Sequence, residues 1–293
     1  MNAAQPGILA AIPPHARYLT FALKSGARPL AELRSLQAAA DGKACVVGIG
    51  ALLAFALQKE IGGLRPFPHY QSEGVQVPST PAALWCWLRG EDRGEVLLRA
   101  RALEKMLAPA FEVAGSVDAF KYGRGLDLTG YEDGTENPKG KKAIEAAIVS
   151  DKRAGFGGAS FVAVQQWIHD LDRFAAMAHK DQDNAIGRRK RDNKELANAP
   201  ASAHVKRTAQ ESFTPEAFVW RRSMPWADAA HAGLVFVAFG KSLDAFDAQL
   251  KRMAGAEDGT VDALFTFTRP VTGAYYWCPP MRKGRIDLRA IGV

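Results

Sequence analysis

The segment "TGYEDGTENP", residues 129–138, concentrates groups that could do chemistry. It carries Glu132, Asp133 and Glu136 between two glycines, and no apolar periodicity runs through it. The spacing of these carboxylates is not that of an EF-hand calcium loop, whose ligands alternate and end in a distant Glu. For an isolated Asp-Gly, the ordinary interpretation is a β-turn that ends here at Asn-Pro. What the carboxylates do therefore depends on what else the chain carries.

Several common catalytic and cofactor motifs are missing from the sequence. No two of the six histidines are spaced as H-x-x-x-H or H-E-x-x-H, so the usual zinc-hydrolase motifs are absent. There is no C-x-x-C-H for covalent haem and no phosphate-binding G-x-x-x-x-G-K-[ST]. A Ser-His-Asp hydrolase is compatible with the composition, but it would lack a G-x-S-x-G elbow, for which "GGAS" at 157–160 is a weak substitute.

The composition is that of a soluble protein with a substantial core, because 47% of the 293 residues are hydrophobic and 24% are charged. No apolar run is long enough to span a bilayer, so no membrane contact is expected. The N-terminal segment has three prolines and no Lys or Arg before its apolar part, unlike a secretory signal. Three widely separated cysteines indicate neither a disulfide framework nor a zinc site, which favours a cytoplasmic location.

The net charge of +7 favours anionic partners, and the densest basic cluster is "GRRKRDNK", residues 187–194. No aromatic stacking pattern or helix-turn-helix signal accompanies this cluster. We therefore expect no nucleic-acid partner. An RNA-binding ferredoxin-like module stays a distant alternative, because "AGLVFVAFG" is only superficially similar to the aromatic strand such a module needs.

Hydrophobic patterns along the chain predict the same order of elements twice. The first half reads as strands at 16–24, 44–50, 83–90 and 111–123, with helices at 29–41 and 95–110. The second half reads as strands at 159–170, 217–225, 232–240 and 262–279, with helices at 171–180 and 242–255. Each half is β-α-β-β-α-β, the ferredoxin-like order. We predict an α+β fold of two tandem ferredoxin-like domains, 1–135 and 136–293, whose antiparallel sheets pack together and leave a cavity between sheet and helices.

Segments spread over most of the chain resemble those of one family. "GYEDGTENP" is similar to the fingerprint of the dye-decolourising peroxidases, haem proteins built from two ferredoxin-like domains. Five segments resemble the family in family order: "FKYGRGLDLTGYEDGTENP", "AIGRRKRDNKEL", "SAHVKRT", "WRRSMPW" and "FTRPVTGAYYW". The short loops resemble the bacterial B-type subgroup. The resemblance implies one haem b per chain, hydrogen peroxide as oxidant and bulky aromatic reducing substrates such as dyes or phenolics.

The resemblance also implies roles for single residues. His204, in "SAHVKRT", becomes the iron ligand, and Asp262 accepts its other N–H and makes it more basic. Asp133 becomes the acid–base group that moves a proton on peroxide. Arg221 stabilises the negative charge that develops there, and Ser223 shares its strand face at a position where some members have an amide. Because Asp replaces the His of other peroxidases, we predict a pH optimum below neutral.

Other residues are implied as cofactor contacts. Arg207 is expected to bind a haem propionate, with help from the "GRRKR" cluster, and Gly134 to let the backbone pass close to the cofactor. Phe236 is the expected apolar wall; Met224, Trp226 and Phe239 are further candidates, although apolar strand residues are more often core. His169 and His231 are expected to be structural or to support the residues that contact the cofactor.

Alternatives and partners follow from the same resemblance. A protein that stores haem or releases its iron is the main alternative function. Family members tend to assemble, so a homo-oligomer is expected. The C-terminal "RIDLRAIGV" is similar to tails that dock into encapsulin shells, with an ordinary chain end as the alternative. Tryptophans and tyrosines, six of each, could carry electrons from the surface, and the sequence does not single any out.

Overall fold

The N-terminal half folds in the predicted ferredoxin-like order. The computed structural model describes residues 3–72, 74–151 and 153–293. The six elements of the first half are β1 (His15–Leu23), α2 (Leu30–Ala39), β2 (Cys45–Gly50), β5 (Leu84–Gly90), α4 (Arg93–Leu107) and β6 (Phe111–Phe120). The strands pair antiparallel in the order β2-β5-β1-β6. The insertion between β2 and β5 holds α3 (Ala51–Ala56) and the hairpin of β3 (Tyr70–Ser72) and β4 (Val75–Val77).

The C-terminal half repeats this arrangement with more interruptions. Its strands are β7 (Ser160–His169), β8 (Trp220–Arg221), β9 (Met224–Ala227), β10 (Ala232–Gly240), β11 (Thr268–Pro270) and β12 (Ala274–Cys278). Its helices are α6 (Leu171–Ala176), α7 (His179–Ile186), α8 (His204–Arg207) and α9 (Asp244–Met253), with short 3-10 turns η1 (Gln210–Ser212) and η2 (Ala263–Thr266). The predicted fold class is confirmed.

Two predicted strands are broken where a side-chain hydroxyl takes over a backbone contact. The predicted strand 217–225 divides into β8 and β9, and at the break Ser223 Oγ accepts from Val237 N at 3.4 Å. The predicted strand 262–279 begins as η2 and divides into β11 and β12. At that break Thr272 Oγ1 accepts from Gln166 N at 2.7 Å, and Pro270 has no N–H for the ladder.

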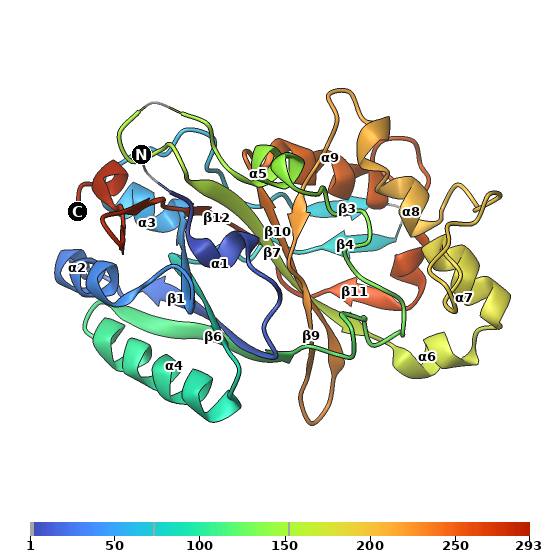
Figure 1. Cartoon of the computed structure of the whole chain (residues 1–293), viewed down its shortest axis with the longest axis horizontal. Helices are drawn as coiled ribbons and strands as arrows, with labels where there is room; N and C mark the ends of the chain where they lie inside the picture. Colours follow the sequence, from blue (N-terminus) through green and yellow to red (C-terminus); the bar gives the residue numbers. More distant parts are fainter. Residues whose placement is uncertain (1–2, 73, 152) are drawn as a thin grey trace.

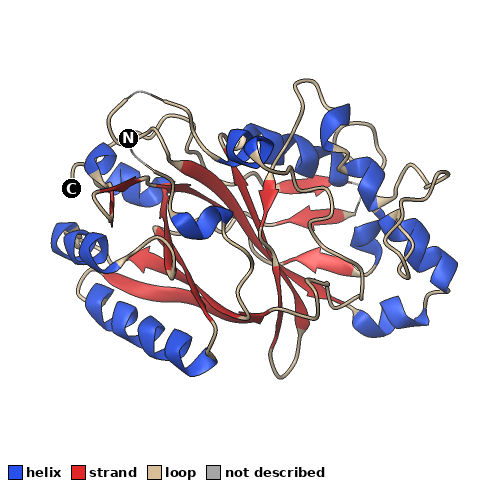
Figure 2. Cartoon of the chain, viewed as in Figure 1, coloured by secondary structure: helices blue, strands red, loops and turns tan. Residues whose placement is uncertain are grey.

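The two sheets join along both edges, which corrects the expectation of two separate packed sheets. Tyr276 of β12 pairs with Gly50 of β2, and Ala119 of β6 pairs with Trp226 of β9. With β7 bridging β12 and β10, the ring β2-β5-β1-β6-β9-β10-β7-β12 closes into a barrel. Figure 1 and Figure 2 show the strands at the centre and the helices outside them. A closed ring leaves its members no open edge.

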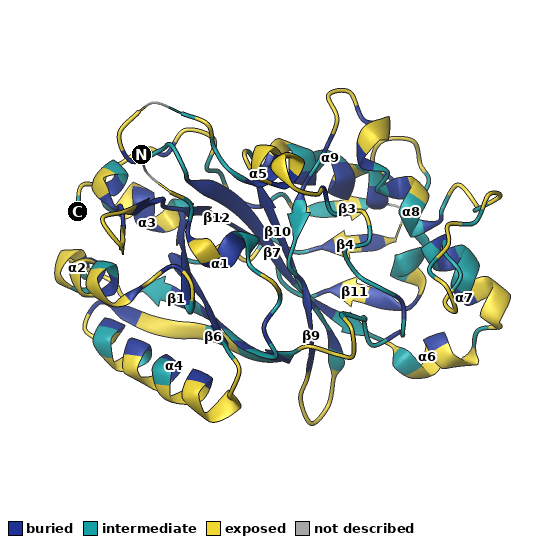
Figure 3. Ribbon diagram, viewed as in Figure 1, coloured by how far each residue is buried: buried dark blue, intermediate teal, exposed yellow. Residues whose placement is uncertain are grey.

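Stacked aromatic rings fill the barrel. Tyr18, Trp85, Trp87 and Tyr276 are buried and lie in contact, with ring centroids 5.9–6.5 Å apart. The outer sheet faces are covered by helices; α4, for example, buries Val96, Ala100, Leu103 and Leu107 along one side. Figure 3 shows the buried sheet and the exposed outer sides of the helices.

The halves are connected by residues 121–159, which hold the decapeptide and α5 (Lys141–Ala147). The predicted boundary at 135/136 falls within this connection and stays a prediction. Before β1 lies α1 (Pro6–Leu9), and after β12 come β13 (Met281–Arg282), β14 (Arg285–Ile286) and the turn η3 (Arg289–Ile291). Among the residues that the structure describes, no helix is both long and apolar enough to cross a membrane.

Candidate active site

The decapeptide forms the turn that its sequence predicts. Gly130 and Gly134 adopt left-handed backbone conformations, with φ of +86° and +75°. A Cβ added to Gly134 would lie 2.8 Å from Asn137 Nδ2. The need for glycine at 134 therefore comes from the turn itself and from the amide of Asn137 packed against it. The close approach of Gly134 to a cofactor stays a prediction.

Asn137 ties this loop to β8, and sequence reasoning did not single it out. Its Oδ1 accepts from Arg221 N at 2.8 Å, while its Nδ2 donates to Arg221 O at 3.0 Å. The clamp brings Asp133 Oδ1 to 4.0 Å from Arg221 Nη1. The two residues predicted to act on peroxide are thus neighbours, although they come from the connection and from the second sheet. The Asn-Pro pair was interpreted only as a turn end, which hid the role of the amide.

His204 and Asp262 form a second pair. His204 opens α8, and its Nδ1 lies 2.7 Å from Asp262 Oδ2. The carboxyl is fully buried, and its other oxygen accepts from Leu264 N at 2.9 Å, which caps η2. An ionised carboxylate can only accept, so Nδ1 carries the proton and Nε2 is left free to ligate a metal. Asp262 therefore lies beside His204 as the sequence predicted, and the same carboxylate also caps η2.

These pairs meet at one cavity on the outer face of the second sheet, beneath α9. It encloses about 890 Å³ of space not filled by atoms, part of it open to solvent. Asp133, Arg221, His204 and Phe236 all line it. Its other walls are mainly aromatic and aliphatic side chains: Trp167, Leu234, Phe246, Leu250, Met253, Leu264 and Phe267. The predicted cavity between sheet and helices is therefore present.

Two predicted contacts lie elsewhere. The guanidinium of Arg207 is occupied by Asp258, with N–O distances of 2.7 and 2.9 Å, and by the carbonyl of Arg252. It fastens α8 to the end of α9 and does not line the cavity. Ser223 is buried at the β8–β9 break and contacts Val237 N, so it does not line the cavity either.

The further apolar candidates of the sequence divide between cavity and barrel. Phe236 points into the cavity. Met224, Trp226 and Phe239 instead belong to the cluster that fills the barrel. Strand alternation separates Phe236 from Phe239, because residues an odd number of positions apart along β10 face opposite sides of the sheet.

A half-buried His–Asp pair also lines the cavity, and its His is one for which the sequence predicted a structural or supporting role. His169 Nε2 lies 3.0 Å from Asp127 Oδ2, and His169 Nδ1 lies 2.6 Å from Thr268 Oγ1. Burial raises the pKa of the Asp127 carboxyl, but hydrogen bonds and charge from His169 and the hydrogen bonds from Thr129 outweigh it, so this pKa lies below its ordinary value. The pair therefore adds a fixed polar wall to a mostly apolar cavity.

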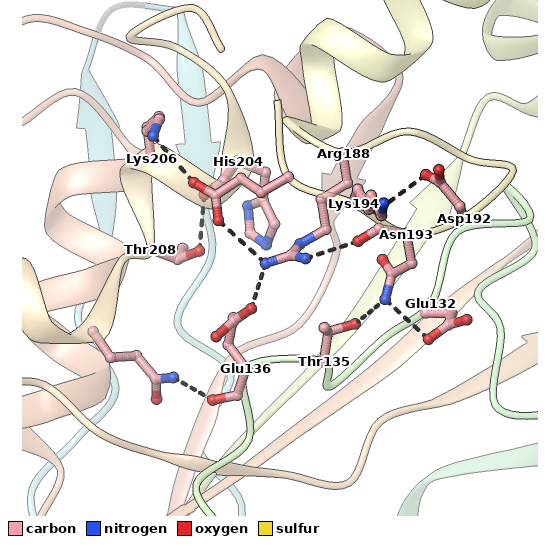
Figure 4. Close-up of polar contacts among 12 residues, drawn as sticks. Glu132, Thr135, Glu136, Arg188, Asp192, Asn193, Lys194, His204, Lys206 and Thr208 are labelled. Atoms are coloured by element: carbon pink, nitrogen blue, oxygen red, sulfur yellow. Dashed lines mark hydrogen bonds and ion pairs between the residues drawn. The ribbon is translucent and has the colours of Figure 1, made fainter. Parts of the chain in front are cut away.

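The basic cluster at 187–194 holds the decapeptide in place (Figure 4). Arg188 pairs with Glu136 and donates to Asn193 O at 2.9 Å. The side chain of Asn193, whose own φ is +56°, donates to Glu132 Oε2 and Thr135 Oγ1 at 2.9 and 2.8 Å. Glu132 and Glu136 are thus occupied in structural contacts, which leaves Asp133 as the carboxylate directed at Arg221.

Comparison with known proteins decides the family. Residues 124–283 match the family model described as "Dyp-type peroxidase, C-terminal", which is more than half of the chain. The chain belongs to the Dyp-type peroxidase family. The predicted enzyme class, a dye-decolourising peroxidase, is confirmed, while the B-type subgroup stays a prediction.

Relatives in sequence and structure agree with this membership. A dye-decolorizing peroxidase of Rhodococcus erythropolis is 30% identical over 284 residues, covering 89% of this chain and 82% of that protein. A dye-decolorizing peroxidase of Brevibacterium linens is 27% identical over 285 residues, covering 91% of this chain and 78% of that protein. The structure of a putative Dyp-type peroxidase from Shewanella oneidensis superposes on this chain with a TM-score of 0.87 at 27% identity. The superposition covers 96% of this chain and 97% of that protein. These relatives give no support to the haem-storage and RNA-binding alternatives.

Proposed function

We propose that this peroxidase binds one haem b in the cavity beneath α9, with His204 Nε2 as the iron ligand. The observation that carries the proposal is that Asp133, Arg221 and a carboxylate-bound His204 line one apolar cavity. The fit to haem is supported by the aromatic walls and by the buried nitrogens of Gln165 and Trp167, which line the cavity without a hydrogen-bond partner. When bound, haem supplies the redox chemistry that cleaves hydrogen peroxide and oxidises an aromatic donor.

The chain's own residues prepare this chemistry. Asp262 keeps the proton on His204 Nδ1 and raises the electron-donating power of the ligand. Asp133 takes a proton from one oxygen of peroxide and returns it to the other. Arg221 stabilises negative charge on the departing oxygen, with greater effect in a cavity walled by apolar groups. The clamp from Asn137 fixes Arg221 in its place beside Asp133.

A visible spectrum tests the proposal. Purified protein reconstituted with haem should show a Soret band that shifts after one equivalent of peroxide. In Asp133→Ala and Arg221→Ala we expect the rate of that shift to fall by about 100-fold or more, with the Arg221 loss at least as damaging. Glu145→Gln, a change of an exposed carboxylate in α5, is the control and should stay within a few-fold of wild type. A colourless protein in the presence of haem would rule the proposal out.

The pH profile is a second test. A carboxylic acid moves protons best in acidic solution, whereas the imidazole used by other peroxidases suits neutral solution. We therefore expect kcat/KM for peroxide to be highest below pH 7. A steady rise of kcat/KM above pH 7 would contradict the role given to Asp133.

We propose that the chain forms a homo-oligomer, as the sequence predicts, and light scattering of the purified protein tests this.

Entry into an encapsulin shell is a further proposal. A structural relative from Mycobacterium smegmatis is described as an encapsulated DyP-type peroxidase. In this chain, however, Leu288 and Ile291 of the proposed docking tail are buried, so docking requires that the tail be released. Co-expression with a shell protein, with and without residues 285–293, tests the tail. The absence of a membrane-spanning helix among the described residues accords with the cytoplasmic location that we propose.

A further inference from the structure

A bulky aromatic donor that cannot enter the cavity beside bound haem needs a route for its electrons through the cavity wall. Among the described residues, two oxidisable aromatic side chains line the cavity, Tyr131 and Trp167. They differ in what their polar atoms meet. Trp167 Nε1 is buried without a hydrogen-bond partner. The hydroxyl of Tyr131 donates to Asp183 Oδ1 at 2.5 Å.

The hydrogen-bond partner of the Tyr131 hydroxyl makes Tyr131 easier to oxidise than a tyrosine without one. A phenol that loses an electron becomes strongly acidic, so its oxidation is easy only where a base can take the proton. Asp183, in α7, supplies that base beside Tyr131. Tyr18 and Tyr276, inside the barrel, have buried hydroxyls with no partner. Tyr275 has a carboxylate partner in Asp247 but does not line the cavity.

Tyr131 also lies directly beneath the basic loop. Asp183 accepts from Lys190 N at 3.0 Å, and Lys190 Nζ lies 5.6 Å from the centre of the Tyr131 ring. A Cβ on Gly130 would come within 2.5 Å of Lys190 Cε, so the glycine allows the lysine to cross the decapeptide here. Lys190 is exposed, whereas Tyr131 is 5% exposed. One ring thus separates the cavity from the exposed cationic side chain of Lys190.

We propose that Tyr131 relays electrons to the haem cavity from anionic aromatic donors held on the basic loop at Lys190. The inference rests on the proposed function, because the oxidant is peroxide acting at the bound haem. It assigns a docking position to one class of donor, sulfonated or carboxylated aromatics. It also assigns the hydrogen bond from Tyr131 to Asp183 a part in the reaction.

The step balances within this group of residues. Tyr131 loses one electron to the haem centre that peroxide has oxidised, its O–H bond breaks, and the proton forms an O–H bond on Asp183. The donor at Lys190 then gives one electron to the Tyr131 radical, and the proton returns from Asp183 to the phenolic oxygen. Two such cycles reduce one peroxide to two waters, with two protons taken from solvent, and leave two singly oxidised donors.

The test uses haem-loaded enzyme and two variants that keep the packing. Tyr131→Phe removes one hydroxyl, and Asp183→Asn keeps an acceptor for it but removes the base. After peroxide is added without a donor, electron paramagnetic resonance should show a tyrosyl radical in wild type and lose it in both variants. We expect kcat/KM for a sulfonated dye to fall by about tenfold or more in both, a loss of roughly 1.4 kcal/mol or more in transition-state stabilisation. The Soret shift with peroxide should be unchanged.

Two further variants make the test specific. Tyr122→Phe alters an exposed tyrosine outside the cavity and should leave both the radical and the dye kinetics as in wild type. Lys190→Gln should raise KM for the anionic dye, leave KM for a neutral phenol unchanged and keep the radical. An unchanged radical and unchanged dye kinetics in Tyr131→Phe would overturn the relay. Failure of the proposed function differs from this outcome, because wild type itself would then show no Soret shift with peroxide.

Discussion

At the scale of single residues, the site depends on carboxylates whose two oxygens have separate tasks. Asp262 orients His204 with one oxygen and caps η2 with the other. Asp127 meets His169 with one oxygen and Thr129 with the other. Each carboxylate is satisfied by several donors, which compensate for its removal from water in a mostly apolar setting. Such groups fix the cavity walls before any ligand binds.

The depressed pKa of Asp127 predicts a pH dependence of stability. Its folded-state pKa lies below the unfolded value, which is about 3.9. The ionised carboxylate therefore stabilises the fold fully above about pH 4, and this stabilisation is lost as the pH falls through the lower folded-state pKa. We expect Asp127→Asn to lower the free energy of unfolding by about 1.5–3 kcal/mol near pH 6.

Denaturant unfolding of wild type and Asp127→Asn from pH 6 downward measures this. The difference in the free energy of unfolding between the two proteins should narrow below pH 4. Asp172→Asn changes an exposed aspartate at the start of α6 and serves as the control. A gap that stays constant down to pH 2 would contradict the role of the ionised carboxylate.

At the scale of elements, the site is assembled by contacts between the connecting segment and the second sheet. The clamp from Asn137 joins the decapeptide to β8 through two hydrogen bonds. The Arg188–Asn193 network holds the other side of the same loop. Asp133 thus lies on a loop but is positioned almost as firmly as a residue of a strand.

We predict that Asn137→Ala reduces activity through Arg221. Loss of both hydrogen bonds leaves the half-buried N–H of Arg221 unpaired and its carbonyl with the 3.3 Å hydrogen bond from Arg222 Nη1, which should lower the free energy of unfolding by about 1–3 kcal/mol. Because Arg221 is then less well fixed, kcat should fall more than KM rises. Asn137→Asp keeps the acceptor for Arg221 N and should lose less stability and activity than Asn137→Ala. Equal kcat values for Asn137→Ala and wild type would show that Asn137 does not position Arg221 for the reaction.

Sequence patterns predicted these elements to different degrees. Strand 232–240 and the helices at 29–41 and 95–110 follow from periodicity, because their apolar spacing is regular. Asp133, Arg221, His204 and Asp262 were predicted through resemblance, and the structure brings them together. Asn137 and Asn193 were missed as parts of the site, because each acts by contacts with residues far along the chain that no local pattern reveals. Arg207 looked free in sequence, and only the fold shows that Asp258 occupies it.

At the scale of the whole molecule, the barrel makes one body of two similar halves. Two ferredoxin-like sheets could be predicted, but their closure through β12–β2 and β6–β9 could not. Pairing between the sheets depends on which strand edges are left open after each sheet has formed. The sequence of an edge strand does not indicate which other strand it will pair with. The closure also encloses Tyr18, Trp85, Trp87 and Tyr276, which in a lone sheet would face solvent.

The position of Asp133 on the connection between the halves has a consequence for engineering and for evolution. The residue belongs to neither repeat, so copying or transplanting one ferredoxin-like unit does not transfer a complete catalyst. The reach from β6 to the cavity is set by the length of the chain between Phe120 and Asp133. Insertions should therefore be tolerated after α5 far better than between these two residues, where each added residue would displace Asp133 from its place beside Arg221.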